Sequence, residues 1–76
     1  MAKQITTTQE RLKEALSIKN IRQIDLSRAS GIPRDSISHY FRGQAVPSIE
    51  RVHLMSEALG VNEVWLLGYD VPMIDD

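Results

Sequence analysis

The sequence of 76 residues contains no cysteine and few aromatic residues, namely one Trp, two Tyr and one Phe. Without cysteine the chain has no disulfide, no thiolate zinc site and no cysteine nucleophile. No segment approaches the roughly 18–20 apolar residues of a membrane span, and the first ten residues, MAKQITTTQE, contain no hydrophobic signal core. We therefore expect a cytoplasmic protein without a membrane partner, stabilised by packing alone.

The length of the chain excludes a multi-domain enzyme, because domains usually contain roughly 100–200 residues. A composition of 42% hydrophobic and 25% charged residues is that of a folded domain and not of a disordered segment. A domain this small buries only about 60% of the surface of its unfolded chain. We therefore expect one small domain, for which a helical bundle is well suited.

The net charge of −1, taken as a whole-chain sum, argues against a polyanionic partner. The distribution of charge argues otherwise. Residues 1–42 contain eight basic and four acidic residues, a net charge of +4, whereas residues 43–76 contain one basic and six acidic residues, a net charge of −5. Two interpretations stay open at this point, a solvated acidic tail on an ordinary domain and a basic surface that binds nucleic acid.

Apolar residues recur at spacings of three and four along the chain, and no stretch alternates with period two for more than a few residues. This pattern predicts an all-α fold, a compact five-helix bundle, with Ala29 and Ile49 among the packing residues. The final stretch YDVPMIDD lacks periodicity, so we expect one domain over residues 1–68 and a linker or tail over residues 69–76. The expected helices cover residues 7–19, 23–30, 33–41, 49–59 and 63–67.

Particular residues set the expected ends of these helices. Thr7 followed by Glu10 has the spacing of a capping box, and Asn20 tolerates the left-handed backbone conformation that ends a helix. Pro33 suits the first helical position, because its missing N–H and fixed φ cost nothing there. Arg22 is a poor cap for the second helix, and Asp25 in the first turn partly compensates by facing the positive helix terminus.

The stretch from Gln23 to Gly43 reads as two short helices joined by a tight turn, the arrangement of a helix-turn-helix unit that places its second helix in the major groove of DNA. Its residues resemble the Cro and phage-repressor type (lambda-repressor-like) helix-turn-helix family over roughly residues 8–68. Two departures stand out: no Ser or Thr precedes Gln23, and Phe41 replaces a frequent Glu, so we expect Phe41 in the core. The resemblance rests on Gln23-x-x-Leu26-Ser27-x-x-x-Gly31-Ile32-Pro33-Arg34-x-Ser36-Ile37-Ser38-x-Tyr40-x-Arg42-Gly43, with Pro47-Ser48 and Ala58-Leu59-Gly60-Val61 following.

The resemblance implies that the start and the outward face of the third helix read base edges. Arginine can donate twice to guanine, aspartate can accept from cytosine and serine can do either. Helical spacing places positions 34, 35, 38 and 39 on one face, with Ser36 nearby. Without the resemblance, a face of this composition is typical of any solvated helix surface. The base-reading candidates are Arg34, Asp35, Ser36, Ser38 and His39.

The resemblance also implies phosphate contacts on both sides of the third helix. Gln23 begins the second helix, whose positive terminus favours an anion. Arg11 in the first helix is a further candidate. The phosphate-binding candidates are Lys19, Arg22 and Gln23 on one side, and Arg42, Gln44 and Ser48 on the other.

The resemblance implies a sequence-specific regulator of transcription in the bacterial cytoplasm, namely a phage-type repressor that binds a palindromic operator of double-stranded DNA as a homodimer. An anti-repressor protein is a candidate further partner. The apolar residues Val64, Trp65 and Leu67 of the last helix are either core residues or a dimer interface. The closing residues are consistent with a hinge into an oligomerisation domain and equally with a naturally short regulator. The alternative is a protein-interaction module, such as an antitoxin or adaptor with the same fold.

The sequence gives no indication of catalysis or of a cofactor. Two histidines, His39 and His53, lie fourteen residues apart with no carboxylate at ligand spacing, so we expect no metal site. The chain has no nucleophile turn or glycine-rich loop, and 76 residues leave little room for a substrate cavity. We therefore expect a non-enzymatic protein.

Overall fold

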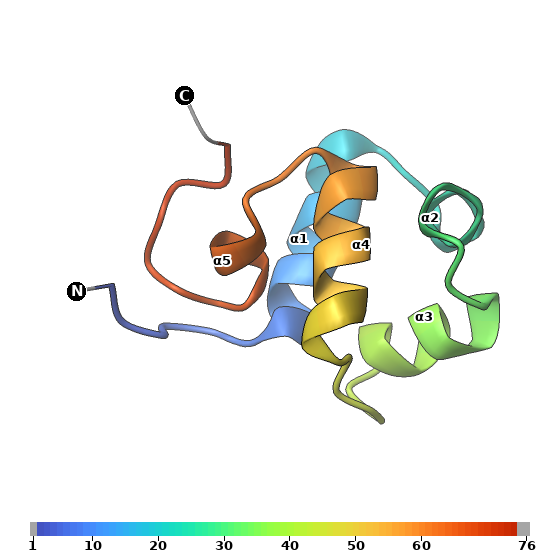
Figure 1. The fold of residues 1–76 in the computed structure, drawn as a ribbon, viewed down its shortest axis with the longest axis horizontal. Coiled ribbons are helices and arrows are strands. Elements are labelled where there is room, and N and C mark those ends of the chain that lie inside the picture. Colours follow the sequence, from blue (N-terminus) through green and yellow to red (C-terminus); the bar gives the residue numbers. More distant parts are fainter. Residues whose placement is uncertain (1, 75–76) are drawn as a thin grey trace.

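Two helices, α1 (Thr8–Lys19) and α4 (Ile49–Leu59), pack against each other at the centre of the molecule (Figure 1). In this computed structural model, which describes residues 2–74, α2 (Gln23–Ser30) and α3 (Arg34–Phe41) lie at one end and α5 (Glu63–Leu66) lies at the other. Within the described residues the only β-type pairing is one isolated bridge between Gln4 and Tyr69. The predicted all-α, five-helix fold is therefore confirmed.

The helix ends follow the chemistry of single residues. The Thr7 hydroxyl accepts a hydrogen bond from the Glu10 backbone N–H at 3.2 Å, while the Glu10 carboxylate lies 4.0 Å from Lys13 Nζ. Asn20 ends α1 in the left-handed conformation with a φ of 54°. Pro33 differs from expectation by one position, because its ψ of 141° is extended and makes it the cap of α3.

The core is one cluster of buried side chains contributed by all five helices and the turn after α2. Phe41 packs against this cluster but is half-buried, so the expectation that it lies in the core is met only in part. Two packing expectations are wrong: Ala29 is exposed, and the Ile49 side chain at the first turn of α4 is 64% exposed, so neither side chain belongs to the buried cluster. The fully or nearly fully buried apolar residues are Leu12, Ala15, Leu16, Leu26, Ile32, Ile37, Tyr40, Val52, Met55, Leu59, Trp65 and Leu66.

The segment after α5 folds back against the domain. The Gly68 carbonyl accepts from the Ile5 N–H at 2.8 Å, and the Asp70 N–H donates to the Lys3 carbonyl at 2.8 Å. Further on, the Met73 carbonyl accepts from the backbone N–H that precedes α5, at 2.7 Å. Residues 69–74 of the expected tail thus lie on the folded body, while residues 75 and 76 fall outside the described part, and the domain boundary at residue 68 stays a prediction.

The helices of the described residues are all too short or too polar to cross a lipid bilayer.

Candidate nucleic-acid interface

The turn between α2 and α3 is fixed by glycine and serine. Gly31 ends α2 with a φ of 77°, a conformation that favours glycine, and its N–H donates to the Ser27 carbonyl at 2.9 Å. The Ser27 hydroxyl donates to the Ile32 carbonyl at 2.6 Å, and the Ser30 hydroxyl accepts from the Ile32 N–H at 3.2 Å. Serine therefore does more at position 27 than allow close packing, because its hydroxyl bonds the backbone across the turn.

The inner face of α3 is anchored to two other helices. Ile37 has no exposed surface, and the Tyr40 hydroxyl accepts a hydrogen bond of 2.8 Å from Arg51 Nη1 of α4. From α1, Gln9 Nε2 donates to the Phe41 carbonyl at 3.3 Å. Sequence reasoning missed Gln9 and Arg51, since both contacts join residues far apart in the chain. These anchors fix which side of α3 faces outward.

The outward side of α3 carries four of the base-reading candidates, and Ser36 lies beside it. Three of them, Arg34, Asp35 and His39, are exposed, and Ser36 and Ser38 are half-buried. The helix begins with Arg34 and Asp35 just after the turn, at the end of the molecule opposite α5 (Figure 1). Helical spacing thus places Arg34, Asp35, Ser38 and His39 on one polar face, with Ser36 beside it.

A groove of about 570 Å³ lies beside this face, between α1, α2 and α3, and we call it the α1–α3 groove. It brings together three predicted residues, Arg22, Gln23 and Arg34, at the amino-terminal ends of α2 and α3. It also contains Lys13 of α1, which sequence reasoning missed, with its ammonium 5.7 Å from the centre of the Phe41 ring. Positive side chains from three helices therefore border one groove.

Arg22 is held by Asp25 in a two-pronged ion pair. Its Nε lies 3.1 Å from Asp25 Oδ2 and its Nη2 lies 3.3 Å from Oδ1, while the backbone N–H of Arg22 also donates to Oδ2 at 3.1 Å. The side-chain hydrogen bonds from Arg22 are the main reason that the pKa of the Asp25 carboxyl is lowered. The carboxylate thus caps α2 and holds a side chain predicted to contact phosphate.

The second set of phosphate candidates lies at the other end of α3. Arg42 and Gln44 are exposed, and the Gln44 N–H donates to the carbonyl of His39 at 2.9 Å. Ser48 is exposed as well, and its hydroxyl accepts from the Arg51 N–H at 3.2 Å as the cap of α4. The chain between α3 and α4 therefore keeps these polar groups at the surface.

Two further candidates lie elsewhere. Lys19 does not line the α1–α3 groove, and its ammonium lies near Gly60 at the carboxyl end of α4, 3.9 Å from where a Cβ would be. Arg11 is only 8% exposed and lies over Trp65, with its guanidinium carbon 4.5 Å from the ring centre. The expectation that Arg11 contacts DNA is therefore wrong, because this side chain turns toward α5.

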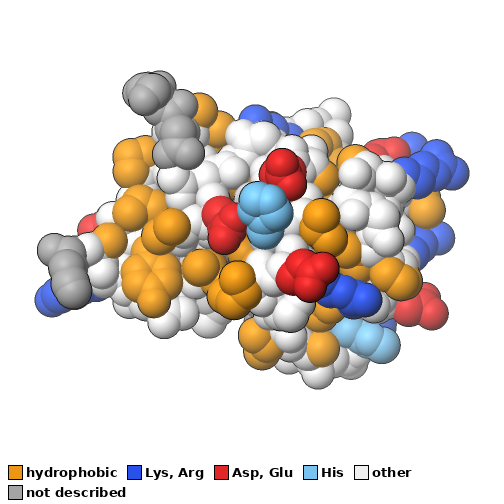
Figure 2. All heavy atoms as spheres, viewed as in Figure 1, with side chains coloured by type: hydrophobic (Ala, Val, Ile, Leu, Met, Phe, Trp, Pro, Cys, Tyr) orange, Lys and Arg blue, Asp and Glu red, His pale blue; other side chains and the backbone are white. Residues whose placement is uncertain are grey.

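The three dimer candidates have different surroundings. Trp65 is 5% exposed and belongs to the core of its own chain, whereas Val64 is 43% exposed and Leu67 is half-buried. Hydrophobic side chains gather over α5 and the segment after it (Figure 2). Of the predicted interface, Val64 and Leu67 are accessible to a partner.

The face over α4 is acidic (Figure 2). His53 of α4 has Nδ1 2.6 Å from Glu63 and Nε2 2.9 Å from Glu57, and these carboxylates raise its pKa, with the hydrogen bond to Glu63 the largest cause. Within residues 2–74 no three His, Cys, Asp or Glu side chains are placed to hold a metal ion. This face therefore differs in charge from the end that carries α2 and α3.

Comparisons with known proteins agree with this geometry. Residues 12–66 match the sequence profile of the helix-turn-helix family. The chain is 36% identical to the HTH-type transcriptional regulator PrtR of Pseudomonas aeruginosa over 56 residues, which are 74% of this chain and 22% of PrtR. Its fold superposes with a TM-score of 0.74 and 27% identity on the restriction-modification controller protein C.AhdI from Aeromonas hydrophila, covering 78% of this chain and 89% of that one.

Proposed function

Because the chain belongs to the Cro and phage-repressor type helix-turn-helix family of DNA-binding transcription regulators, we propose that it recognises a specific sequence of double-stranded DNA and represses transcription there. Proteins of this family are typically non-enzymatic. The observation that carries the proposal is the outward face of α3, which is polar and exposed while Ile37 and Tyr40 anchor its inner side. An α-helix presented in this way fits the major groove.

The proposed reading residues are the four on the outward face of α3, with Ser36 nearby. Arg34 stands at the start of the helix, where a side chain can reach the base edges most directly, and its fork of donors suits guanine. Asp35 beside it is suited to accept from cytosine. Ser38 and His39 continue the same face with groups that can donate or accept, and the Ser36 hydroxyl lies nearby.

The proposed phosphate contacts flank α3. Gln23 begins α2, whose free backbone N–H groups favour an anion, and Arg22 with Lys13 supplies positive charge beside it. Arg42, Gln44 and Ser48 form the second contact region, and Lys19 contributes charge farther from the groove. The acidic face of α4 differs in charge from this end, so electrostatics would orient the domain before contact.

We infer that two copies bind a palindromic operator. A single domain of this size covers only about 600–1,000 Å² of DNA-facing surface, so pairing on adjacent half-sites supplies affinity. The half-sites would lie about one helical turn apart, roughly 34–36 Å. The exposed apolar side chains Val64 and Leu67 support association through the α5 end, with Trp65 acting from the core behind them. A separate anti-repressor protein would compete for the α3 face or for this association.

Selection of binding sites from random duplexes, followed by two arginine variants, tests the proposal. Arg34→Ala should cost about 1–3 kcal/mol of binding free energy and relax preference at one base pair, because it removes a base contact. Arg42→Ala should weaken binding to all DNA sequences alike, because it removes a phosphate contact. The slope of log K against log salt should become shallower by about one unit. Arg28→Ala, exposed on α2, is the matched control.

The outcomes separate the alternatives. Recovery of no duplex, or binding that neither arginine variant alters, refutes the assignment and favours the protein-interaction module. A selected sequence without two-fold symmetry is consistent with α3 as the base-reading helix but refutes the palindromic operator.

A further inference from the structure

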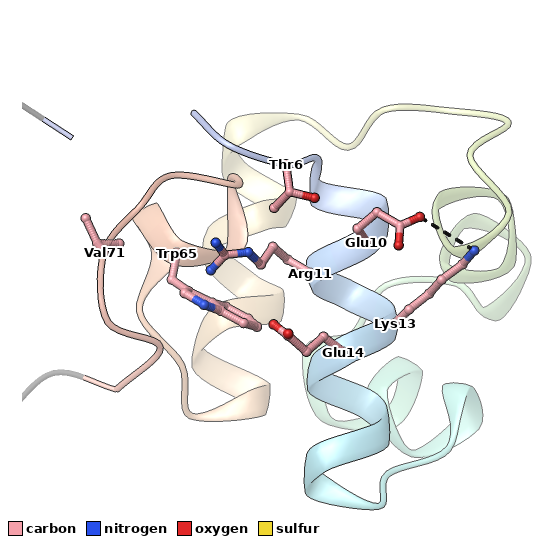
Figure 3. A pocket seen from close by; sticks show the side chains of 7 residues that line it. All are labelled: Thr6, Glu10, Arg11, Lys13, Glu14, Trp65 and Val71. Carbon is pink, nitrogen blue, oxygen red and sulfur yellow. Dashed lines mark ion pairs between the residues drawn. The ribbon is translucent and has the colours of Figure 1, made fainter. Parts of the chain in front are cut away.

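A second cavity shares Lys13 with the α1–α3 groove and extends toward α5, and we call it the α1–α5 cavity. Its volume is about 610 Å³, and it lies between α1, α5, Thr6 in front of α1, and Val71 in the segment after α5. Figure 3 shows the side chains of Arg11 and Glu14 reaching from α1 toward Trp65 of α5. Of the residues predicted from the sequence to contact DNA, only Arg11 lines this cavity, and its side chain is turned toward Trp65.

Arg11 is the unusual residue of this cavity. Its side chain is buried with 8% exposure, its guanidinium covers the Trp65 ring, and its Nη1 atom has no hydrogen-bond partner in the described part of the chain. A guanidinium does not lose its proton in proteins. A buried charged donor without an acceptor costs stability, and an apolar side chain would cover the tryptophan without that cost. The arrangement therefore favours an acceptor from outside the chain.

The carboxylates near Arg11 do not supply that acceptor. Within residues 2–74 no carboxylate oxygen lies within the 4.0 Å of an ion pair with Arg11. Glu10 faces Lys13 at 4.0 Å, so these two charges offset each other. Glu14, one helical turn after Arg11, is exposed and forms no ion pair in the same part of the chain. The cavity thus presents one unpaired cation and one unpaired carboxylate on the same helical face.

We propose that the α1–α5 cavity binds a small zwitterion of the α-amino acid class. The ligand carboxylate accepts hydrogen bonds from the Arg11 guanidinium, and the ligand ammonium group faces the Glu14 carboxylate. Trp65 and Val71 supply the apolar wall against which an aliphatic ligand side chain packs. A simple anion is repelled by Glu14 and a simple cation by Arg11, so the cavity selects a ligand that carries both charges.

The test uses the fluorescence of Trp65, which is the only tryptophan of the chain and lines the cavity. The intact protein is titrated with glycine, which carries the zwitterion alone, and with L-leucine, which adds an aliphatic side chain. The control ligands are N-acetyl-L-leucine, which lacks the ammonium group, and L-leucinamide, which lacks the carboxylate. We expect a saturable change with L-leucine and affinities weaker by about tenfold or more for both control ligands, since each loses one charged hydrogen bond.

Three variants assign the response to residues. Arg11→Gln should abolish it, and Arg28→Gln on α2, outside the cavity, should leave it unchanged. Because Arg11 is buried and its loss can unfold the domain, Glu14→Gln is the second test at an exposed position. This substitution should weaken the binding of L-leucine and strengthen the binding of N-acetyl-L-leucine. An unspecific effect on folding would not change the two affinities in opposite directions.

Absence of a saturable response to both glycine and L-leucine overturns the proposal, and solvent is then the partner of Arg11. Equal affinity for L-leucine and its two control ligands overturns the proposal as well, because the cavity then binds the apolar side chain of the ligand and does not recognise its two charges. No DNA is present in these titrations, so their outcome is independent of the proposed operator binding.

Discussion

The ion pair between Arg22 and Asp25 leads to the prediction that removing a negative charge strengthens DNA binding at this site. Asp25 accepts three hydrogen bonds from Arg22, two of them from the guanidinium at 3.1 and 3.3 Å. The pair lowers the pKa of Asp25 and raises the pKa of Arg22, so both groups are charged at neutral pH. A guanidinium held in this way gives up its carboxylate before it binds a phosphate, and the carboxylate itself repels the phosphate.

Asp25→Asn frees the guanidinium and retains a side-chain oxygen that accepts the Arg22 N–H at the start of α2. One more phosphate contact per domain should steepen the slope of log K against log salt by about 0.9, and by about 1.8 for two copies on one operator. Between 50 and 200 mM salt, the smaller change means that the variant loses about 3.5-fold more affinity than the parent protein. At low salt the variant should bind more tightly.

The assay is a series of fluorescence-anisotropy titrations on a selected duplex at several salt concentrations, after thermal melting has verified that the variant folds. Asp70→Asn is the matched control, because Asp70 is exposed, lies beyond α5 and forms no ion pair among residues 2–74. An unchanged slope in Asp25→Asn refutes the reasoning. An equal change in the Asp70 variant refutes it too, because net charge alone would then explain the effect.

Two further predictions concern stability. Gly68→Ala should lower the Tm, because Gly68 has a φ of 99° and a Cβ there would collide with the Thr6 carbonyl oxygen. Gly31 has a φ of 77° and open space around it, so Gly31→Ala should lower the free energy of unfolding only by the backbone cost of about 1–2 kcal/mol. Equal losses of the two variants in urea unfolding would contradict the collision at Gly68. The raised pKa of His53 makes its contribution to stability complete below about pH 6.5 and lost as the pH rises through the raised value. Glu63→Gln should therefore flatten the dependence of Tm on pH above 6.5, and a parallel shift at all pH values would speak against this pair.

The parts of the fold that the sequence predicted are those set by short-range chemistry. Asn20 and Gly31 end their helices in the left-handed conformation because few residues adopt it easily. Thr7 caps α1 with its own hydroxyl. The polar face of α3 follows from helical spacing once Ile37 is assigned to the core. Each of these features depends on residues within about one helical turn of one another.

The rest of the fold depends on which elements meet in space, and the sequence carries no direct record of that. An arginine at position 11 is typical of an exposed helix surface. The side chain lies over Trp65 only because α5 approaches α1 in the folded chain. Lys13 reaches the α1–α3 groove because α1 packs against α3. The segment over residues 69–74 is bound through backbone hydrogen bonds, which leave no periodic pattern in the sequence.

Lys13 links the two proposed sites, because it lines both the α1–α3 groove and the α1–α5 cavity. Its ammonium lies between Glu10, which borders the cavity, and the ring of Phe41, which borders the groove. A zwitterion that draws Lys13 toward the cavity removes positive charge from the groove and weakens DNA binding. Binding linkage is reciprocal, so DNA then weakens zwitterion binding by the same factor. Coupling through Lys13 should disappear in Lys13→Met, which leaves Arg11 and Gln23 in place. If Lys13 does not move when the cavity fills, the zwitterion and DNA bind independently already in the parent protein.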